Sequence, residues 1–345
     1  MIELAQLDWK NLPFGFQPTD FNVRCYFRDG KWGDIEVSSS DKIEMHMAAS
    51  SLHYGQEIFE GLKAFRGKDG KVRIFRMKDN AARIRSSAEG LCMPPVPEEI
   101  FCKMAEMVVK LNARFIPPYG TGASLYLRPI EIGMSATVGV RPATEYLFMI
   151  FVSPVGPYFK SGFNPTRICI SRQYDRVAPK GTGRFKTAGN YAASLKSGQL
   201  AKEKGYSTML YLDPLEKKYL DECGPANFFA IKDGKYITPA SESILPSVTN
   251  RSLMQLARDM GIEVEQRRIT VDELDHVEEA AACGTAAVAS PIGEIDDLDT
   301  GKKYVIAPDG RPGPIVTKLY KKLQAIQYGE EPDIHGWTSV VDVDD

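Results

Sequence analysis

The sequence lacks the cysteine and histidine spacings on which metal sites and disulfide frameworks are built. It has 345 residues but only six cysteines and four histidines. No two cysteines form a C-x-x-C pair, and no histidine stands three or four residues from another imidazole or thiol. A zinc ribbon and a disulfide-stapled secreted domain are therefore excluded, and we expect no metal site. Scattered thiols of this kind suit a reducing, cytoplasmic environment.

The chain also lacks an excess of charge of either sign and any long apolar run. Lys and Arg total 43 against 45 Asp and Glu, which gives a net charge of -2. This balance favours no nucleic-acid or membrane-surface partner, so we expect a small-molecule substrate. The first residues, MIELAQLDWKNLPFG, do not have the basic start and apolar run of a signal peptide. The most apolar stretch, 146–155, is about half of the roughly 20 residues that a membrane helix needs, and it predicts a buried strand.

The length and the 43% of hydrophobic residues predict two domains, because one core rarely holds so many apolar side chains. The segment 154–165, PVGPYFKSGFNP, is rich in proline and glycine and lies between apolar strands, which is typical of an interdomain linker. We therefore expect a small α/β domain over 1–153 and a large domain over 166–345. Hairpins and helices alternate in the first and strands dominate the second, so the fold class is α+β or α/β.

Capping residues and glycines predict where the helices begin and end. Ser50 or Ser51 should cap a short helix that ends at Gly61, and Asp79 should cap a helix that runs to residue 89. Pro97 starts an amphipathic helix whose Ile100, Met104, Met107, Val108 and Leu111 share one face. In the second half, helices are expected over 190–204, 250–260 and 315–327.

The loop 180–191, KGTGRFKTAGNY, allows two interpretations. A glycine-rich loop that ends in Lys-Thr before a helix is typical of a nucleotide-binding P-loop. That pattern needs a glycine directly before the lysine, and here Phe185 precedes Lys186. A lysine beside an aromatic ring and small residues at the start of a helix instead suits a Schiff-base lysine.

The other parts of a pyridoxal-phosphate site can also be found in the sequence. The segment 245–249, LPSVT, leads into a helix, so the amides of Val248 and Thr249 would face a phosphate, although Thr249 could simply cap the helix. Thr285 stands in a small-residue turn, and such turns more often reflect tight packing. Glu222 ends a strand and could meet a pyridine nitrogen or be an edge carboxylate in water.

The order and spacing of several segments match a known family over nearly the whole chain. These segments are SLHY (51–54), IFEGLKAF (58–65), SLYLRP (124–129), KTAGNY (186–191), LP (245–246), GTA (284–286) and IQYG (326–329). The sequence resembles the branched-chain aminotransferases of the eukaryotic-like kind, within the fold type IV pyridoxal-phosphate enzymes. The resemblance implies a two-domain fold with the cofactor at the domain interface, and a homodimer.

The resemblance also implies a role for each matching residue. Lys186 would carry pyridoxal 5'-phosphate as a Schiff base, Tyr191 would bind its phenolic oxygen, and Glu222 would pair with its pyridine nitrogen. The phosphate would be bound by Arg83, Val248, Thr249 and Thr285. The implied substrate contacts are Phe14, Tyr54, Phe59, Tyr126, Arg128, Ala286 and Ala287.

The implied reaction transfers the amino group of L-leucine, L-isoleucine or L-valine to 2-oxoglutarate, as in branched-chain amino acid biosynthesis. The chain departs from the family pattern at Ala188, where a glycine is usual, and at Pro225, near the expected pocket. Ala287 and Ser290 stand where some relatives have a redox C-x-x-C pair. The alternatives are a sibling of the same fold, namely a D-amino-acid aminotransferase or an aminodeoxychorismate lyase, and a noncatalytic nucleotide-binding protein.

Overall fold

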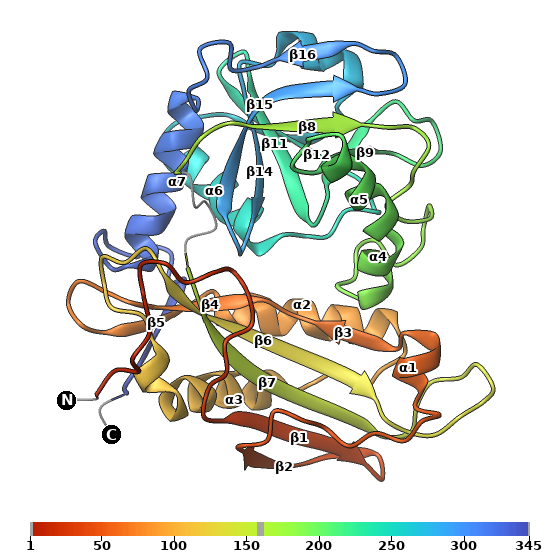
Figure 1. The fold of residues 1–345 in the computed structure, drawn as a ribbon, viewed down its shortest axis with the longest axis vertical. Helices are drawn as coiled ribbons and strands as arrows, with labels where there is room; N and C mark the ends of the chain where they lie inside the picture. The colour runs from red at the N-terminus through yellow and green to blue at the C-terminus, as the bar shows by residue number, and fades with distance from the viewer. Residues whose placement is uncertain (1–2, 157–161, 344–345) are drawn as a thin grey trace. The chain divides into compact units, whose positions relative to one another are not determined.

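The computed structural model describes residues 3–156 and 162–343, which fall into two compact units (Figure 1). Unit 1 comprises Met1–Tyr158, Phe185–Ala188 and Ala325–Asp345, and unit 2 comprises Phe159–Arg184 and Gly189–Gln324. Two segments of the predicted 166–345 domain thus belong to unit 1, because each pairs with a strand of the unit 1 sheet. Residues 157–161 of the predicted linker lie outside the described residues, so the boundaries 1–153, 154–165 and 166–345 stay predictions.

Unit 1 is built on an eight-stranded antiparallel sheet in the order β17-β5-β4-β6-β7-β1-β2, with β3 paired to β6. Its strands are β1 (Asn22–Arg28), β2 (Lys31–Ser38), β3 (Glu57–Phe59), β4 (Leu62–Arg66), β5 (Val72–Phe75), β6 (Ser124–Gly133), β7 (Tyr146–Val155) and β17 (Thr338–Val341). Its helices are α1 (Ser50–Tyr54), α2 (Met77–Gly90), α3 (Glu98–Leu111) and the 3-10 helix η1 (Ala113–Phe115).

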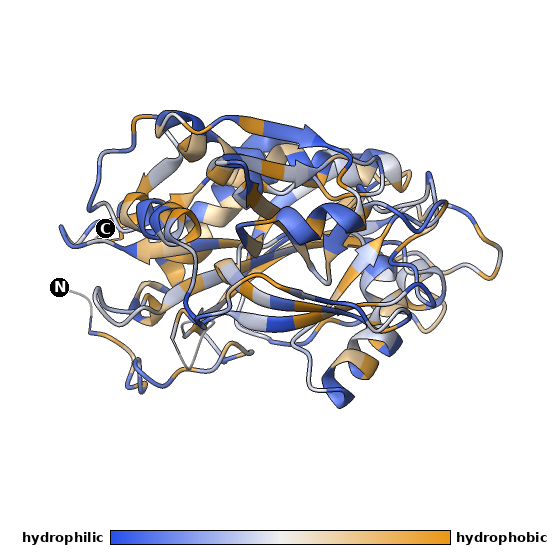
Figure 2. Ribbon diagram, turned by 90° about the horizontal axis from the view of Figure 1, so that it is seen from above, coloured by the Kyte–Doolittle hydropathy of each residue, from blue (hydrophilic) through white to orange (hydrophobic). Residues whose placement is uncertain are grey.

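Helices α2 and α3 supply the apolar side chains that cover one face of this sheet. Hydrophobic and hydrophilic residues follow one another along many strands (Figure 2), which leaves the other face free for polar groups. The predicted apolar face of α3 packs against the core, with Met104 and Val108 buried and Ile100, Met107 and Leu111 partly buried. Phe101, which the prediction did not include, also faces the core and stacks on Phe148 with ring centroids 5.9 Å apart.

Unit 2 contains a nine-stranded sheet in the order β10-β9-β8-β15-β14-β11-β12-β13, with β16 paired to β15. Its strands are β8 (Thr166–Ile170), β9 (Met209–Leu212), β10 (Leu220–Cys223), β11 (Ala226–Lys232), β12 (Lys235–Pro239), β13 (Val264–Arg267), β14 (Glu279–Gly284), β15 (Val288–Asp297) and β16 (Lys303–Val305). Its helices are α4 (Ala188–Ala193), α5 (Leu195–Glu203), α6 (Val248–Asp259), the 3-10 helix η2 (Val271–His276) and most of α7 (Pro314–Gln327). Because β10 also pairs with β11, the strands from β10 to β11 close into a ring around an apolar core.

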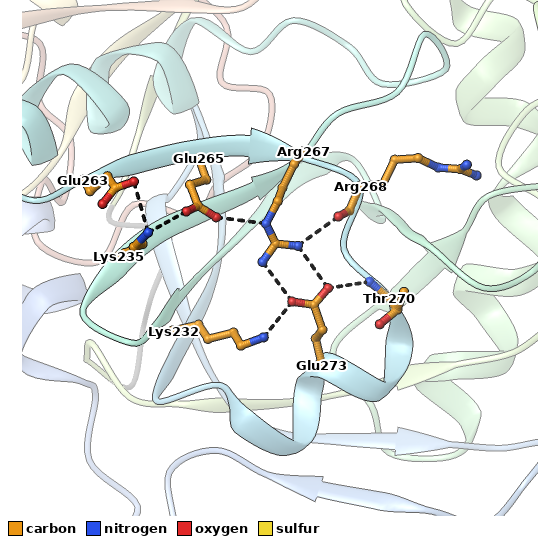
Figure 3. A network of polar contacts seen from close by, with 8 residues as sticks. All are labelled: Lys232, Lys235, Glu263, Glu265, Arg267, Arg268, Thr270 and Glu273. Carbon is orange, nitrogen blue, oxygen red and sulfur yellow. Dashed lines mark hydrogen bonds and ion pairs between the residues drawn. The ribbon is translucent and has the colours of Figure 1, made fainter.

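An ion-pair network covers the edge strand β13 (Figure 3). Arg267 donates to Glu265 at 2.9 Å and to Glu273 at 2.8 Å, and Lys235 donates to Glu265 at 2.8 Å. Lys232 reaches the same Glu273 at 2.7 Å, and hydrogen bonding from Arg267 lowers the pKa of Glu273 to about 2. These side chains tie β13, the last strand in the order of the described sheet, to η2 and to β12.

Two helix boundaries in unit 1 differ from the sequence prediction. α1 ends at Tyr54 with Gly55 in the left-handed region (φ 61°), rather than at Gly61, because the apolar residues after it form β3 against β6. α2 begins at Met77, and Asp79 is not its cap; its carboxylate pairs with Arg76 at 2.8 Å inside the first turn.

Two helices of unit 2 also differ from expectation. The helix expected over 190–204 is divided at Ser194, whose hydroxyl donates to the carbonyl of Tyr191 at 2.8 Å. α6 begins at Val248 rather than at residue 250, and its cap is Ser247, whose hydroxyl accepts the amide of Asn250 at 3.1 Å. The competing interpretation of Thr249 as the cap is therefore wrong.

Candidate active site

Lys186 lies in a short extended segment that pairs with β3 in unit 1. Its carbonyl accepts the amide of Phe59 at 3.0 Å, and its own amide donates to the Ser87 hydroxyl of α2 at 3.0 Å. The next residue, Thr187, donates its hydroxyl to the carbonyl of Glu57 at 2.8 Å. The backbone around the lysine is therefore fixed from both sides, and its Nζ lies 4.8 Å from the centroid of the Phe59 ring.

The aromatic ring that contacts the lysine amine is thus Phe59. Phe185, which the sequence suggested for this role, packs instead against the end of α2, so closely that a Cβ on Gly90 would overlap its ring.

Arg83 lies on α2 and forms a bidentate ion pair with Glu60, with Nε to Oε1 at 2.7 Å and Nη2 to Oε2 at 2.8 Å. Both side chains are buried, with exposed fractions of 8% and 0%. A buried pair of this kind orients the guanidinium and balances its charge. Sequence reasoning missed Glu60, although a carboxylate inside the apolar run IFEGL signals a buried partner.

Four of the expected substrate residues form one cluster on the unit 1 sheet. Tyr126 and Arg128 alternate on β6 and share a face, and Arg128 Nη2 donates to the Tyr126 hydroxyl at 3.1 Å. The Arg128 guanidinium lies 4.9 Å from the centroid of the Phe59 ring. Phe14 meets Tyr126 edge to face at 5.8 Å. The buried Nε of Arg128 has no hydrogen-bond partner among the described residues.

Lys63 joins this cluster and was not foreseen from the sequence. It pairs with Tyr126 in the register of β4 and β6, and its Nζ lies 5.9 Å from the Phe14 ring centroid. Burial lowers the pKa of Lys63 to about 8. Gly61 carries no side chain because the Tyr126 hydroxyl occupies the space of a Cβ. The sequence signal that could have identified Lys63 is its position inside an apolar strand.

Tyr54 is the expected substrate residue of unit 1 that lies outside this cluster. It ends α1, is 41% exposed, and donates its hydroxyl to the carbonyl of Val138. Its ring lies near His53. Among the described contacts, none joins it to the Phe59 and Tyr126 cluster.

In unit 2, Glu222 lies on β10 and is 3% exposed. Its Oε1 accepts the amide of Leu245 and, at 3.5 Å, the side-chain amide of Asn227. Arg176 Nη1 lies 3.6 Å from its Oε2. The interpretation of Glu222 as a solvated edge carboxylate is therefore wrong, because the carboxylate is buried and has two amide donors and a cation beside it. The sequence had suggested neither Asn227 nor Arg176 as a partner.

The first turn of α6 presents the amides of Val248 and Thr249, as expected. Ser247 already occupies the amide of Asn250 as the cap. The amides that precede it in a helix have no partner within the helix, and the helix dipole adds positive potential there. This end of α6 can bind an anion such as a phosphate.

Thr285 and Ala287 lie in the turn between β14 and β15, directly before a strained residue. Val288 has φ 64°, a conformation that β-branched residues rarely adopt, and the amide of Ala289 donates to the carbonyl of Ala287 across it at 2.8 Å. Ala286 lies in the same turn. The small residues here therefore form a tight, strained turn.

Tyr191 lies in α4, where its carbonyl accepts the Ser194 amide at 3.1 Å.

Across residues 3–156 and 162–343, no cluster of three or more His, Cys, Asp or Glu side chains is arranged to hold a metal ion. In the same ranges, no helix has both the length and the apolar character needed to cross a membrane.

Comparisons with known proteins agree on one family. The family model for amino-transferase class IV matches residues 57–295. A branched-chain-amino-acid aminotransferase of Haemophilus influenzae is 44% identical over 341 residues, which covers 97% of this chain and 98% of that protein. One of Helicobacter pylori is 46% identical over 340 residues and covers 98% of each. The crystal structure of the branched-chain amino acid aminotransferase of Thermobaculum terrenum in its PLP form superposes with a TM-score of 0.76 at 25% identity, over 94% of this chain and all of that one.

Proposed function

Because the chain belongs to the class IV aminotransferases, and within them to the branched-chain-amino-acid aminotransferases, we propose that it transfers the amino group of L-leucine, L-isoleucine or L-valine to 2-oxoglutarate with pyridoxal 5'-phosphate. One observation carries the proposal. The amine of Lys186 and the guanidinium of Arg128 lie 4.8 and 4.9 Å from the centroid of the same Phe59 ring. A reactive amine, an apolar surface and a cation for a carboxylate are thus gathered in one place.

The residues of each unit fit the cofactor. Unit 1 provides the Lys186 amine to hold it and the buried Arg83 guanidinium for its phosphate. In unit 2, the proposed phosphate donors are the first turn of α6 and Thr285, and the buried carboxylate of Glu222 suits a protonated ring nitrogen. When bound, pyridoxal phosphate supplies a carbonyl carbon that accepts an amino group and a ring that withdraws electrons from it.

The chain's own groups would then move protons and fix charges. Lys186 would remove the proton from the Cα of the amino acid and deliver it to the carbonyl-derived carbon of the cofactor, and in the second half-reaction it would carry a proton in the opposite direction. Glu222 keeps a proton on the ring nitrogen, because an adjacent carboxylate favours the cationic form. Tyr191 donates a hydrogen bond to the phenolic oxygen.

The pocket must accept both an aliphatic side chain and the distal carboxylate of glutamate. Phe59 and Tyr126 offer apolar surface for the first, with Phe14, Tyr54, Ala286 and Ala287 as further proposed contacts. Arg128 offers a cation for the second. Its orphaned Nε supports this assignment, because a buried donor without a partner is costly unless a ligand satisfies it.

We also propose a homodimer that acts in the cytoplasm on small-molecule substrates. Apolar side chains of unit 1 are exposed on two segments, with exposed fractions of 83% at Met47 and 89% at Val138. The amide of Thr137 donates to the carbonyl of Ala48 at 2.9 Å and holds these segments together. A patch of this kind is typical of an association surface.

Purified protein loaded with pyridoxal phosphate tests the activity. We expect it to be yellow, to lose its colour with borohydride, and to carry the reduced label on the Lys186 peptide in mass spectrometry. L-leucine should support turnover with 2-oxoglutarate and D-alanine should not, which separates the proposal from a D-amino-acid aminotransferase. A colourless protein that binds ATP, or a label on another lysine, would contradict it.

A further inference from the structure

Arg176 is a buried arginine that the proposed mechanism does not use. It lies between β8 and the loop before Lys186 and is 7% exposed. Its Nη2 donates to the carbonyl of Gly183 at 3.2 Å and to the carbonyl of Ser243, and its Nη1 lies 3.6 Å from Oε2 of Glu222. A buried guanidinium with three such partners is a fixed structural centre, since each donor has a defined direction.

Each partner belongs to a different segment that leads to a proposed cofactor residue. Gly183 stands three residues before Lys186 in the chain, and Ser243 stands in the loop that leads to the first turn of α6. Glu222 is on β10. One side chain therefore links these segments, which are far apart in the sequence.

The lack of a side chain at Gly183 shows how closely its loop approaches Arg176 and Ser243. A Cβ on Gly183 would overlap the Ser243 carbonyl and lie 2.9 Å from Nη2 of Arg176 and 2.7 Å from Cγ2 of Val177. Because the φ of Gly183 is not in the left-handed region, the absence of a side chain is required by this packing and not by backbone conformation. The loop can approach Arg176 this closely only if residue 183 is a glycine.

Charge explains why an arginine stands here. Glu222 and its neighbour Asp221 are each 3% exposed. Burial raises the pKa of Asp221 to about 6, and the positive charge of Arg176 opposes that rise. Removing the cation would take a positive charge away from two buried carboxylates, which is unfavourable.

We propose that Arg176 is a positioning residue: it keeps the Glu222 carboxylate charged and in place for the cofactor ring, and it ties the loop before Lys186 to the loop before α6. This inference rests on the proposed cofactor role of Glu222. Arg176 acts on the cofactor through Glu222, and its carbonyl contacts act on the two loops.

A double-mutant cycle tests the first part. Wild type, Arg176→Gln, Glu222→Gln and the double variant are titrated with pyridoxal phosphate, and the affinity and visible absorbance of the bound cofactor are recorded. Arg176→Gln should weaken binding by about tenfold or more, the scale of a lost interaction with a charged group. It should also change the absorbance in the same sense as Glu222→Gln. In the Glu222→Gln background it should cause no further spectral change.

Two variants separate charge from folding. Arg176→Lys keeps the charge but not the fork of donors, so it should keep the wild-type spectrum while weakening affinity. This comparison is decisive even if Arg176→Gln does not fold. Arg258→Gln, at an exposed arginine on α6, is the matched control and should behave as wild type.

An unchanged spectrum in Arg176→Gln, with only a lower melting temperature, would overturn the inference and leave Arg176 purely structural. An altered spectrum in Arg176→Lys would likewise overturn the charge role. The proposed function fails separately, if wild type binds no pyridoxal phosphate or if Glu222→Gln leaves the spectrum unchanged.

Discussion

The residues proposed to bind cofactor and substrate differ in kind between the two units. In unit 1 they are charged and aromatic side chains, with Lys186 and Arg128 beside the Phe59 ring and Arg83 paired with Glu60. Unit 2 contributes one buried carboxylate, Glu222, and the backbone amides at the start of α6. Side-chain chemistry can be deleted by substitution, whereas backbone amides persist when a side chain is changed. The two units should therefore differ in their sensitivity to mutation.

The largest effect is expected in unit 1, from Lys186→Ala. Turnover of L-leucine with 2-oxoglutarate should fall by roughly a thousandfold or more, because the variant loses both the covalent anchor and the base. The borohydride adduct should disappear while the circular dichroism spectrum is kept. Lys180→Ala, at an exposed lysine of the same loop, is the control. Retained activity in Lys186→Ala would remove the lysine from the mechanism.

The side chain of unit 2 that should matter most is Glu222. Glu222→Gln should retain bound cofactor but lose about a hundredfold in turnover, since a neutral amide cannot hold the proton on the ring nitrogen. Stopped-flow measurement of a single half-reaction on saturated protein checks this. Poor binding with normal turnover per bound cofactor would point to a different role for the carboxylate.

Arg128→Gln should distinguish substrates. The glutamate half-reaction should lose about 2 to 3 kcal/mol more than the leucine half-reaction, which is the scale of a hydrogen bond between charged groups. Single-turnover rates with each amino acid give this difference. Equal losses for both would show that Arg128 supports the Tyr126 cluster and does not bind substrate.

Thr249→Ala tests whether the backbone amide of residue 249, rather than its side chain, contributes to cofactor binding. Its amide remains and Ser247 still caps α6, so cofactor affinity should fall by only about 1 kcal/mol or less. Equilibrium titration with pyridoxal phosphate measures the effect. Ser247→Ala is the useful companion, because loss of the cap should lower the free energy of unfolding by about 1 kcal/mol. A loss of binding in Thr249→Ala comparable to that in Arg83→Gln would erase the contrast between the units.

The smallest effect is expected on the surface of unit 2, in the network of Figure 3. Arg267→Gln removes contacts to Glu265 and Glu273 but should change the free energy of unfolding by less than about 1 kcal/mol, because exposed ion pairs are screened by water and salt. Urea denaturation at low and high salt measures it. A large loss that does not depend on salt would show that β13 needs Arg267 to pair with β12.

The candidate residues that the sequence offered belong to contiguous motifs. Lys186 was a candidate from its loop and from the family resemblance, and the first turn of α6 was a candidate from the segment 245–249 that leads into it. The partners Glu60 and Arg176 were not predicted, because nothing in a single sequence tells which distant segment a buried charge will meet. The family resemblance gave the roles but not these contacts, which depend on how strands such as β3 and β10 are paired.

Local propensity also failed where tertiary pairing decided the structure. Ile58 and Phe59 suit a helix or a strand equally, and pairing with β6 made them a strand. Strands β14 and β17 have little local signal in the sequence. The alanines of β14 carry little β propensity, and β17 is a short segment near the chain end whose partner, β5, lies far away in the sequence.

The position of β17 has a consequence for how the protein is made. Thr338 pairs with Phe75 at the edge of the unit 1 sheet, so that edge stays uncovered until residue 338 has left the ribosome. Contacts between such distant residues slow folding, because a long loop must close before they form. The sheet of unit 1 is thus completed only after the strands of unit 2 have been synthesised, and a nascent chain halted before residue 338 would expose β5 to pairing with other chains.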